Sequence, residues 1–133
     1  MPDRFARREF GFLLHGQKFF LRHVGFPTQR EFREFLVRRA PAHSYYSTAF
    51  YKDPDAKTMV EKGWLGAELI FDLDADHVPG AEKLGYRAQL ERVKEHFLRL
   101  VEDFVIRDFG FKESDLLLTF SGGRGYHCHV LHE

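Results

Sequence analysis

Three carboxylates stand at alternate positions of one short segment, "FDLDAD" at residues 71–76. Successive side chains of a β-strand point to opposite faces, so we expect Asp72, Asp74 and Asp76 on one face and Phe71 and Leu73 on the other. Carboxylates this close repel one another unless a cation or strong hydrogen-bond donors offset their charge. Because Mg²⁺ and Mn²⁺ prefer oxygen ligands, the segment predicts a metal site. Alternatively, the three aspartates could simply lie at a solvated strand end or cap a helix.

A second segment, "SGGRGYHCHV" at residues 121–130, combines glycines, a hydroxyl group and cations. Its glycines permit a tight turn whose backbone N–H groups are free to face a phosphate, and Ser121 and Arg124 carry groups suited to phosphate oxygens. His127 and His129 are expected on one strand face, where His127 lies nearer the turn and is the better phosphate contact. The histidines could instead bind a metal or be ordinary strand residues. The spacing is not that of a Walker A loop or a GxGxxG fingerprint.

An acidic strand and a basic turn in one small protein complement each other as a site for a nucleoside triphosphate with its metal ion.

The helices and strands that must position these two segments are predicted from hydrophobic periodicity. Residues 8–16 and 18–26 predict a hairpin that turns at Gly16–Gln17, and residues 28–40 predict a helix with a capping box at Thr28 and Glu31 and a stop at Pro41.

Further along, residues 44–51 predict a strand, and residues 52–63 a polar loop with a short helical turn. Residues 64–76 predict one strand that enters buried and leaves with the acids, residues 86–109 an amphipathic helix, and residues 115–133 a strand, a turn and a strand. We therefore expect an α/β (α+β) fold in which a mixed sheet is flanked by helices.

The composition is that of a soluble globular protein: 133 residues, 44% hydrophobic and 16% aromatic, with a net charge of zero. This length predicts a single domain over residues 1–133. The one cysteine, Cys128, excludes an internal disulfide and a Cys-rich zinc site and fits a cytoplasmic location. No segment approaches the roughly 18 to 20 apolar residues that a membrane span needs, so no membrane partner is expected.

With these motifs in place, the chain resembles a known family. The segments "REFGF", "LRHVGF", "YYSTAFY", "GWLGAELIFDLDADH" and "LLLTFSGGRGYHCHV" are similar, in order and approximate spacing, to the small catalytic subunit of archaeal–eukaryotic DNA primase, in its archaeal form. The likeness covers nearly the whole chain. It implies the primase catalytic fold, with this chain as its N-terminal part and the fold incomplete at the C-terminus.

The resemblance also implies residue roles. The catalytic, metal-binding pair would be Asp72 and Asp74, and the nucleotide contacts would be Ser121, Arg124, His127 and Arg22. Arg22 would be a further active-site cation and Glu9 a helper residue, although both could equally be solvated hairpin residues. Asp76 is common in the archaeal pattern but is not one of the catalytic pair.

The implied activity is template-directed synthesis of short RNA or DNA primers by two-metal nucleotidyl transfer, with Mg²⁺ or Mn²⁺ as cofactor. The implied partners are nucleoside triphosphates, a single-stranded DNA template and a large regulatory subunit. The family's third catalytic aspartate belongs to a later segment, so we expect the isolated chain to be weak or inactive. No structural zinc is expected. Two alternatives stay open: a primase-like polymerase domain of a repair or plasmid replication system, and a non-catalytic nucleotide- or nucleic-acid-binding module.

Overall fold

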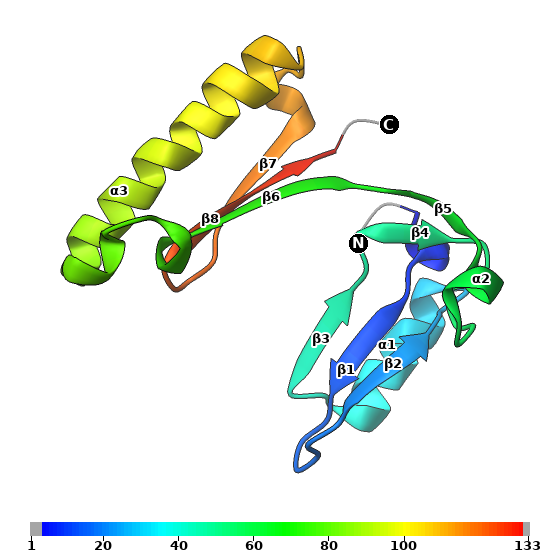
Figure 1. Ribbon diagram of the computed structural model, residues 1–133. Helices are drawn as coiled ribbons and strands as arrows, with labels where there is room; N and C mark the ends of the chain where they lie inside the picture. Colours follow the sequence, from blue (N-terminus) through cyan, green and yellow to red (C-terminus); the bar gives the residue numbers. More distant parts are fainter. Residues whose placement is uncertain (1–3, 132–133) are drawn as a thin grey trace. The chain divides into compact units, whose positions relative to one another are not determined.

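The computed structural model describes residues 4–131, and the chain divides into two compact units between Ala67 and Glu68 (Figure 1). The first unit contains β1 (Phe10–Leu13), β2 (Phe20–Val24), α1 (Gln29–Arg39), β3 (His43–Tyr46), β4 (Ala49–Tyr51), α2 (Met59–Lys62) and β5 (Trp64–Ala67). The second contains β6 (Leu69–Asp74), α3 (Tyr86–Arg99), a π-helix (Leu100–Asp108), β7 (Leu116–Phe120) and β8 (Gly125–Val130). Short 3-10 helices cover Phe5–Arg7, Ala75–His77, Ala81–Lys83 and Glu113–Asp115.

The predicted α+β class is confirmed. The expectation of one mixed sheet was wrong, because the described strands form three sheets in which the strand pairs are antiparallel. The single-domain expectation for residues 1–133 stays a prediction. Residues 132 and 133, which the last predicted strand included, lie outside the described residues. Among residues 4–131, no helix is both long and apolar enough to cross a membrane.

The first unit is built on an antiparallel sheet in the order β2-β1-β3, and the predicted hairpin forms β1 and β2. The helix α1 begins where the capping pattern placed it, because the Thr28 hydroxyl accepts a hydrogen bond from the Glu31 amide at 3.3 Å. Phenylalanines form the core between sheet and helix. Phe12 is completely buried, and its ring centroid lies 4.5 Å from that of Phe35 on α1. The 3.6-residue pattern that predicted α1 is therefore the pattern of its contacts with the sheet.

Two segments that were each predicted as one strand are divided between sheets. Residues 44–51 form the end of β3 and all of β4, and the Ser47 hydroxyl between them donates to the Ala49 carbonyl at 2.6 Å and so turns the chain. Residues 64–76 form β5, which pairs with β4 in a two-stranded sheet, and then β6. The expectation of a buried entry was wrong, because Trp64 is 64% exposed and Leu65 55% exposed in that small sheet.

The second unit is built on an antiparallel sheet in the order β6-β8-β7, along which α3 lies (Figure 1). Buried Phe97 and Val101 from the helical segment meet Cys128 of β8, and Phe71 and Leu73 of β6 pack against them. This apolar cluster fixes which face of the sheet is inside. The side chains at the intervening positions of β6 and β8 are therefore on the opposite face.

The predicted helix over residues 86–109 is an α-helix only as far as Arg99, after which the chain continues as a π-helix. Its buried residues Val93, Phe97, Val101 and Val105 are four apart. Four residues turn an α-helix by about 40° more than one full turn, so this spacing drifts around the helix. A π-helix has i to i+5 hydrogen bonds, such as the 3.0 Å bond from the Phe109 amide to the Phe104 carbonyl, and more residues per turn than an α-helix. The π-helical segment therefore rotates residues four apart in the opposite sense and offsets the drift.

Candidate metal and nucleotide site

The two predicted catalytic aspartates lie at the end of β6, on the face opposite the apolar cluster. The antiparallel register places Asp72 opposite His127 and Asp74 opposite Gly125 of β8. Phe71 and Leu73 point into the cluster, as the alternation predicted. The acidic and the glycine-rich segments, far apart in the sequence, are thus adjacent strands of one sheet.

The geometry of these aspartates suits a cation. The Asp72 Oδ1 atom lies 3.3 Å from His127 Nε2. The Asp74 Oδ1 atom is buried and has no hydrogen-bond partner among the described residues, an arrangement that is costly unless an ion or water completes it. Two carboxylates fit the oxygen preference of Mg²⁺ and Mn²⁺. The part of the chain that the structure describes contains no group of three or more His, Cys, Asp or Glu side chains that could hold a metal ion. A bound ion would therefore take further oxygen ligands from water or substrate.

Asp76 departs from the predicted alternation. The strand ends at Asp74, and the 3-10 helix Ala75–His77 takes Asp76 out of the strand geometry. The Asp76 carboxylate instead accepts from the Arg124 guanidinium at 3.0 Å. Both side chains are more than half exposed, so this pair contributes little to stability. It does hold Arg124 next to the end of the acidic strand.

The glycine-rich turn is ordered by its own serine. The Ser121 hydroxyl oxygen accepts hydrogen bonds from the amides of Gly123 at 3.2 Å and Gly125 at 3.0 Å. The Tyr86 hydroxyl, at the start of α3, donates to the Gly123 carbonyl at 2.8 Å. Two of the amides expected to be free for phosphate are therefore used inside the turn, which corrects that expectation. In return, the turn is preformed and fixed to α3.

The residues after the turn alternate as predicted. Tyr126 and Cys128 face the apolar cluster, while His127 and His129 share the other face, with ring centroids 6.4 Å apart. Burial raises the pKa of the Cys128 thiol, which makes it a poor nucleophile at neutral pH.

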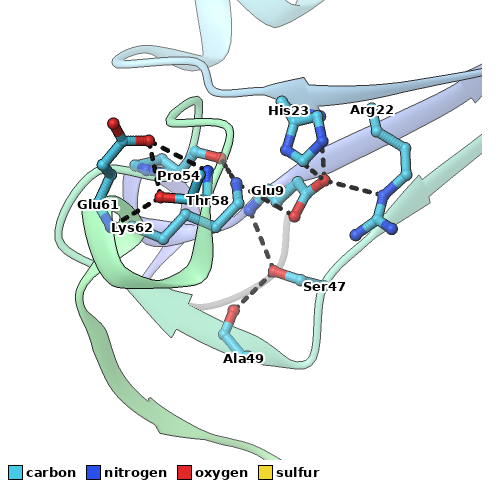
Figure 2. Close-up of polar contacts among 9 residues, drawn as sticks. All are labelled: Glu9, Arg22, His23, Ser47, Ala49, Pro54, Thr58, Glu61 and Lys62. Carbon is cyan, nitrogen blue, oxygen red and sulfur yellow. Dashed lines mark hydrogen bonds and ion pairs between the residues drawn. The ribbon is translucent and has the colours of Figure 1, made fainter.

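Arg22 and Glu9 lie in the first unit, whereas the other predicted site residues lie in the second. Figure 2 shows the Glu9 carboxylate between Arg22 and Lys62. The Arg22 Nε atom donates to Glu9 Oε1 at 3.2 Å. The Glu9 side chain is only 8% exposed, so it is not a solvated hairpin residue, whereas the Arg22 side chain is 59% exposed.

Lys62 was missed by the sequence analysis. It ends α2, and its ammonium group is buried against Glu9. The T-x-x-E pattern of Thr58 and Glu61 was a readable signal for α2, and the structure contains that capping box. Nothing in a polar loop sequence, however, marks one lysine as buried.

Comparison with known proteins finds similar sequences. Residues 71–133 match the family model described as DNA primase small subunit. Proteins named DNA primase small subunit PriS are 47% identical in Methanocella arvoryzae, 49% in Picrophilus torridus and 50% in Methanosarcina acetivorans. These matches cover 100%, 98% and 98% of this chain but 34%, 35% and 32% of the relatives, so the chain spans about a third of their length. The chain is thus similar, along nearly its whole length, to part of the proteins named DNA primase small subunit.

Proposed function

We propose that this chain supplies the metal- and nucleotide-binding part of a primase that makes short primers on a single-stranded DNA template. The observation that carries the proposal is the β6–β8 register, which sets Asp72 opposite His127 and ends with Arg124 beside the acidic strand. Acidic and basic groups so close in one sheet suit a ligand that is itself a cation–polyanion pair. A nucleoside triphosphate with its metal ion has that chemistry.

In this proposal Asp72 and Asp74 hold Mg²⁺ or Mn²⁺, with the unpartnered Asp74 oxygen as one ligand atom. The bound ion would offset negative charge on the phosphates and lower the pKa of an attacking hydroxyl. Arg124 and His127 neutralise and orient the triphosphate through charge-assisted hydrogen bonds. When the phosphates bind, Arg124 would leave Asp76 and pair with a phosphate oxygen. The guanidinium would therefore have an anionic partner both before and after binding.

The activity and partners of the whole enzyme belong to the same proposal. We expect nucleoside triphosphates, template DNA and a large regulatory subunit as partners, and a cytoplasmic location. With two carboxylates in place of three, nucleotidyl transfer by the 133-residue chain should be weak or undetectable. A primer-extension assay on a homopolymer template with Mn²⁺ checks this, and robust synthesis by the chain alone would contradict it.

The first experiment is calorimetric titration of the chain with ATP and Mn²⁺. Asp72→Ala/Asp74→Ala is expected to abolish the binding heat. Asp103→Ala is the matched control, because Asp103 is also an acid of the second unit, about half exposed and paired with Arg107 on the helical segment. It should bind as the unmodified chain does. Equal binding by the double aspartate variant would refute the proposed site.

A further inference from the structure

The hydroxyl group of Tyr86 ties the start of α3 to the glycine-rich turn between β7 and β8, at one end of the sheet of the second unit (Figure 1). It donates a hydrogen bond to the Gly123 carbonyl at 2.8 Å. Tyr86 is 55% exposed and is not among the residues that pack in the apolar cluster, so its ring contributes little to the core. What Tyr86 contributes to the unit is therefore this hydrogen bond.

A second residue of α3 fixes the place from which Tyr86 extends. Gln89, three residues further along the same side of the helix, donates from Nε2 to the carbonyls of Ala81 and Leu84, each at 3.0 Å. Both carbonyls belong to the connection that leaves the acidic strand β6 and enters α3, and Ala81 is 1% exposed. The first residue of α3 is thus held at a defined position relative to the end of β6.

The peptide group that Tyr86 holds carries a donor without a partner. The Ala75 amide donates to the Arg124 carbonyl at 3.2 Å, as in a continued β6–β8 ladder, but the Ala75 carbonyl accepts from the Val78 amide at 3.1 Å instead of from Arg124. Among residues 4–131 the Arg124 amide therefore has no acceptor. This amide and the Gly123 carbonyl belong to one planar, trans peptide group. The bond from Tyr86 consequently fixes the direction of the Arg124 N–H, which points away from the tyrosine.

Arg124 thus carries two donors suited to one anion. Its guanidinium lies beside the end of the acidic strand, where it pairs with Asp76 at 3.0 Å, and its side chain is 52% exposed. Its amide remains a main-chain donor of the turn, whereas the amides of Gly123 and Gly125 are bonded to Ser121. A backbone N–H and a guanidinium from one residue are a favourable combination for phosphate oxygens.

We propose that Tyr86 is a positioning residue of the nucleotide site, which holds the Gly123–Arg124 peptide group so that the Arg124 amide donates to the phosphate that its guanidinium also binds. This rests on the proposed function, from which phosphate as the ligand of Arg124 comes. Tyr86 does not touch the ligand in this role. Its effect is to order the turn before the phosphate arrives, so that less conformational entropy is lost on binding.

The direct test is nuclear magnetic relaxation of the Arg124 backbone N–H in the chain without nucleotide. In Tyr86→Phe, which removes only the hydroxyl group, we expect the order parameter to fall from the rigid value of about 0.85 toward the flexible range below about 0.6. Tyr126→Phe is the matched control, because it removes the same group from a ring that stacks on Phe97 in the apolar cluster of the same unit. It should leave the Arg124 amide unchanged.

Titrations with Mn²⁺ alone and with Mn²⁺ plus tripolyphosphate provide the second readout. Tyr86→Phe should weaken tripolyphosphate binding about two- to tenfold, which corresponds to the loss of one hydrogen bond. It should leave the binding of Mn²⁺ alone to Asp72 and Asp74 unchanged, whereas a general structural loss would weaken both. ATP should show the same fold-change as tripolyphosphate, because Arg124 binds the phosphates and not the nucleoside.

Several results would overturn the inference. These are an unchanged order parameter or an unchanged tripolyphosphate affinity in Tyr86→Phe, an equal loss in Tyr126→Phe, and a loss that is seen with ATP but not with tripolyphosphate. Mn²⁺ binding that requires Asp72 and Asp74 would stand in each of these cases, so the proposed function and this inference fail separately.

Discussion

Gly125 begins β8 and lies opposite Asp74 of β6 in the candidate site. A Cβ atom there would lie 2.7 Å from the Leu73 carbonyl oxygen and 3.3 Å from the Asp74 Cα atom. Both are backbone atoms of the paired strand and cannot rotate away, so the strands themselves must separate. Overpacking of this kind costs about 1–3 kcal/mol. We therefore expect Gly125→Ala to destabilise the second unit by that amount.

A second glycine of the same turn is the control. A Cβ atom on Gly123 would lie 3.7 Å from the Ser121 hydroxyl oxygen, an ordinary contact, and its φ is outside the left-handed range. Gly123→Ala should therefore leave stability unchanged or raise it by up to about 1 kcal/mol, because alanine restricts the unfolded chain.

The assay uses Cys128, the one cysteine of the chain, which is fully buried on β8. A thiol reagent can modify it only when the second unit opens, and if reclosing outpaces modification the labelling rate measures the open population. A loss of 1–3 kcal/mol corresponds to labelling about 5- to 150-fold faster for Gly125→Ala. If Gly125→Ala labels no faster than Gly123→Ala, the argument from strand contact is wrong.

Three further predictions concern the charged residues around Glu9, the phenylalanine core of the first unit and the Arg124–Asp76 ion pair. Since the folded-state pKa of Glu9 lies below its ordinary value of 4.5, its contribution to stability is complete above that value and is lost as pH falls through the folded-state pKa. Urea unfolding followed by Trp64 fluorescence should show this acid sensitivity, and Glu9→Gln should reduce it. Phe12→Ala should cost about 3–5 kcal/mol in the same unfolding assay, whereas Val37→Ala, at a 79% exposed position, should stay within about 0.5 kcal/mol; equal losses would contradict the assigned core. Asp76→Asn should change stability by less than about 1 kcal/mol and tighten ATP binding by removing a competing anion, and calorimetry that shows unchanged or weaker affinity would count against that competition.

The sequence predicted the parts of the fold that depend on local periodicity. The hairpin and α1 were found because alternation and capping residues are short-range signals. The face that Asp72 and Asp74 share followed from the same alternation, and β6 continues as a strand through both. Asp76 broke the pattern because the strand ends two residues before it, at Asp74, and a strand end depends on pairing with the neighbouring strand as well as on the local sequence.

Other features depend on contacts between distant residues and had no local signal. The burial of Lys62 requires Glu9, more than fifty residues earlier, and no window along the chain contains both. The change from α- to π-helix at Leu100 was also missed, because the sequence does not show which of the apolar residues between 86 and 109 are the buried ones.

The Ser121 hydroxyl has one consequence for what the turn can recognise. A serine hydroxyl has one hydrogen to donate and two lone pairs with which to accept. The amides of Gly123 and Gly125 occupy both lone pairs, so only the hydrogen is available to a ligand. This side chain can therefore approach atoms that accept hydrogen bonds, such as phosphate oxygens, and has nothing to offer an ammonium group or a bare metal ion. The backbone amides of the turn thus leave the Ser121 hydroxyl only a donor role, which favours anionic ligands.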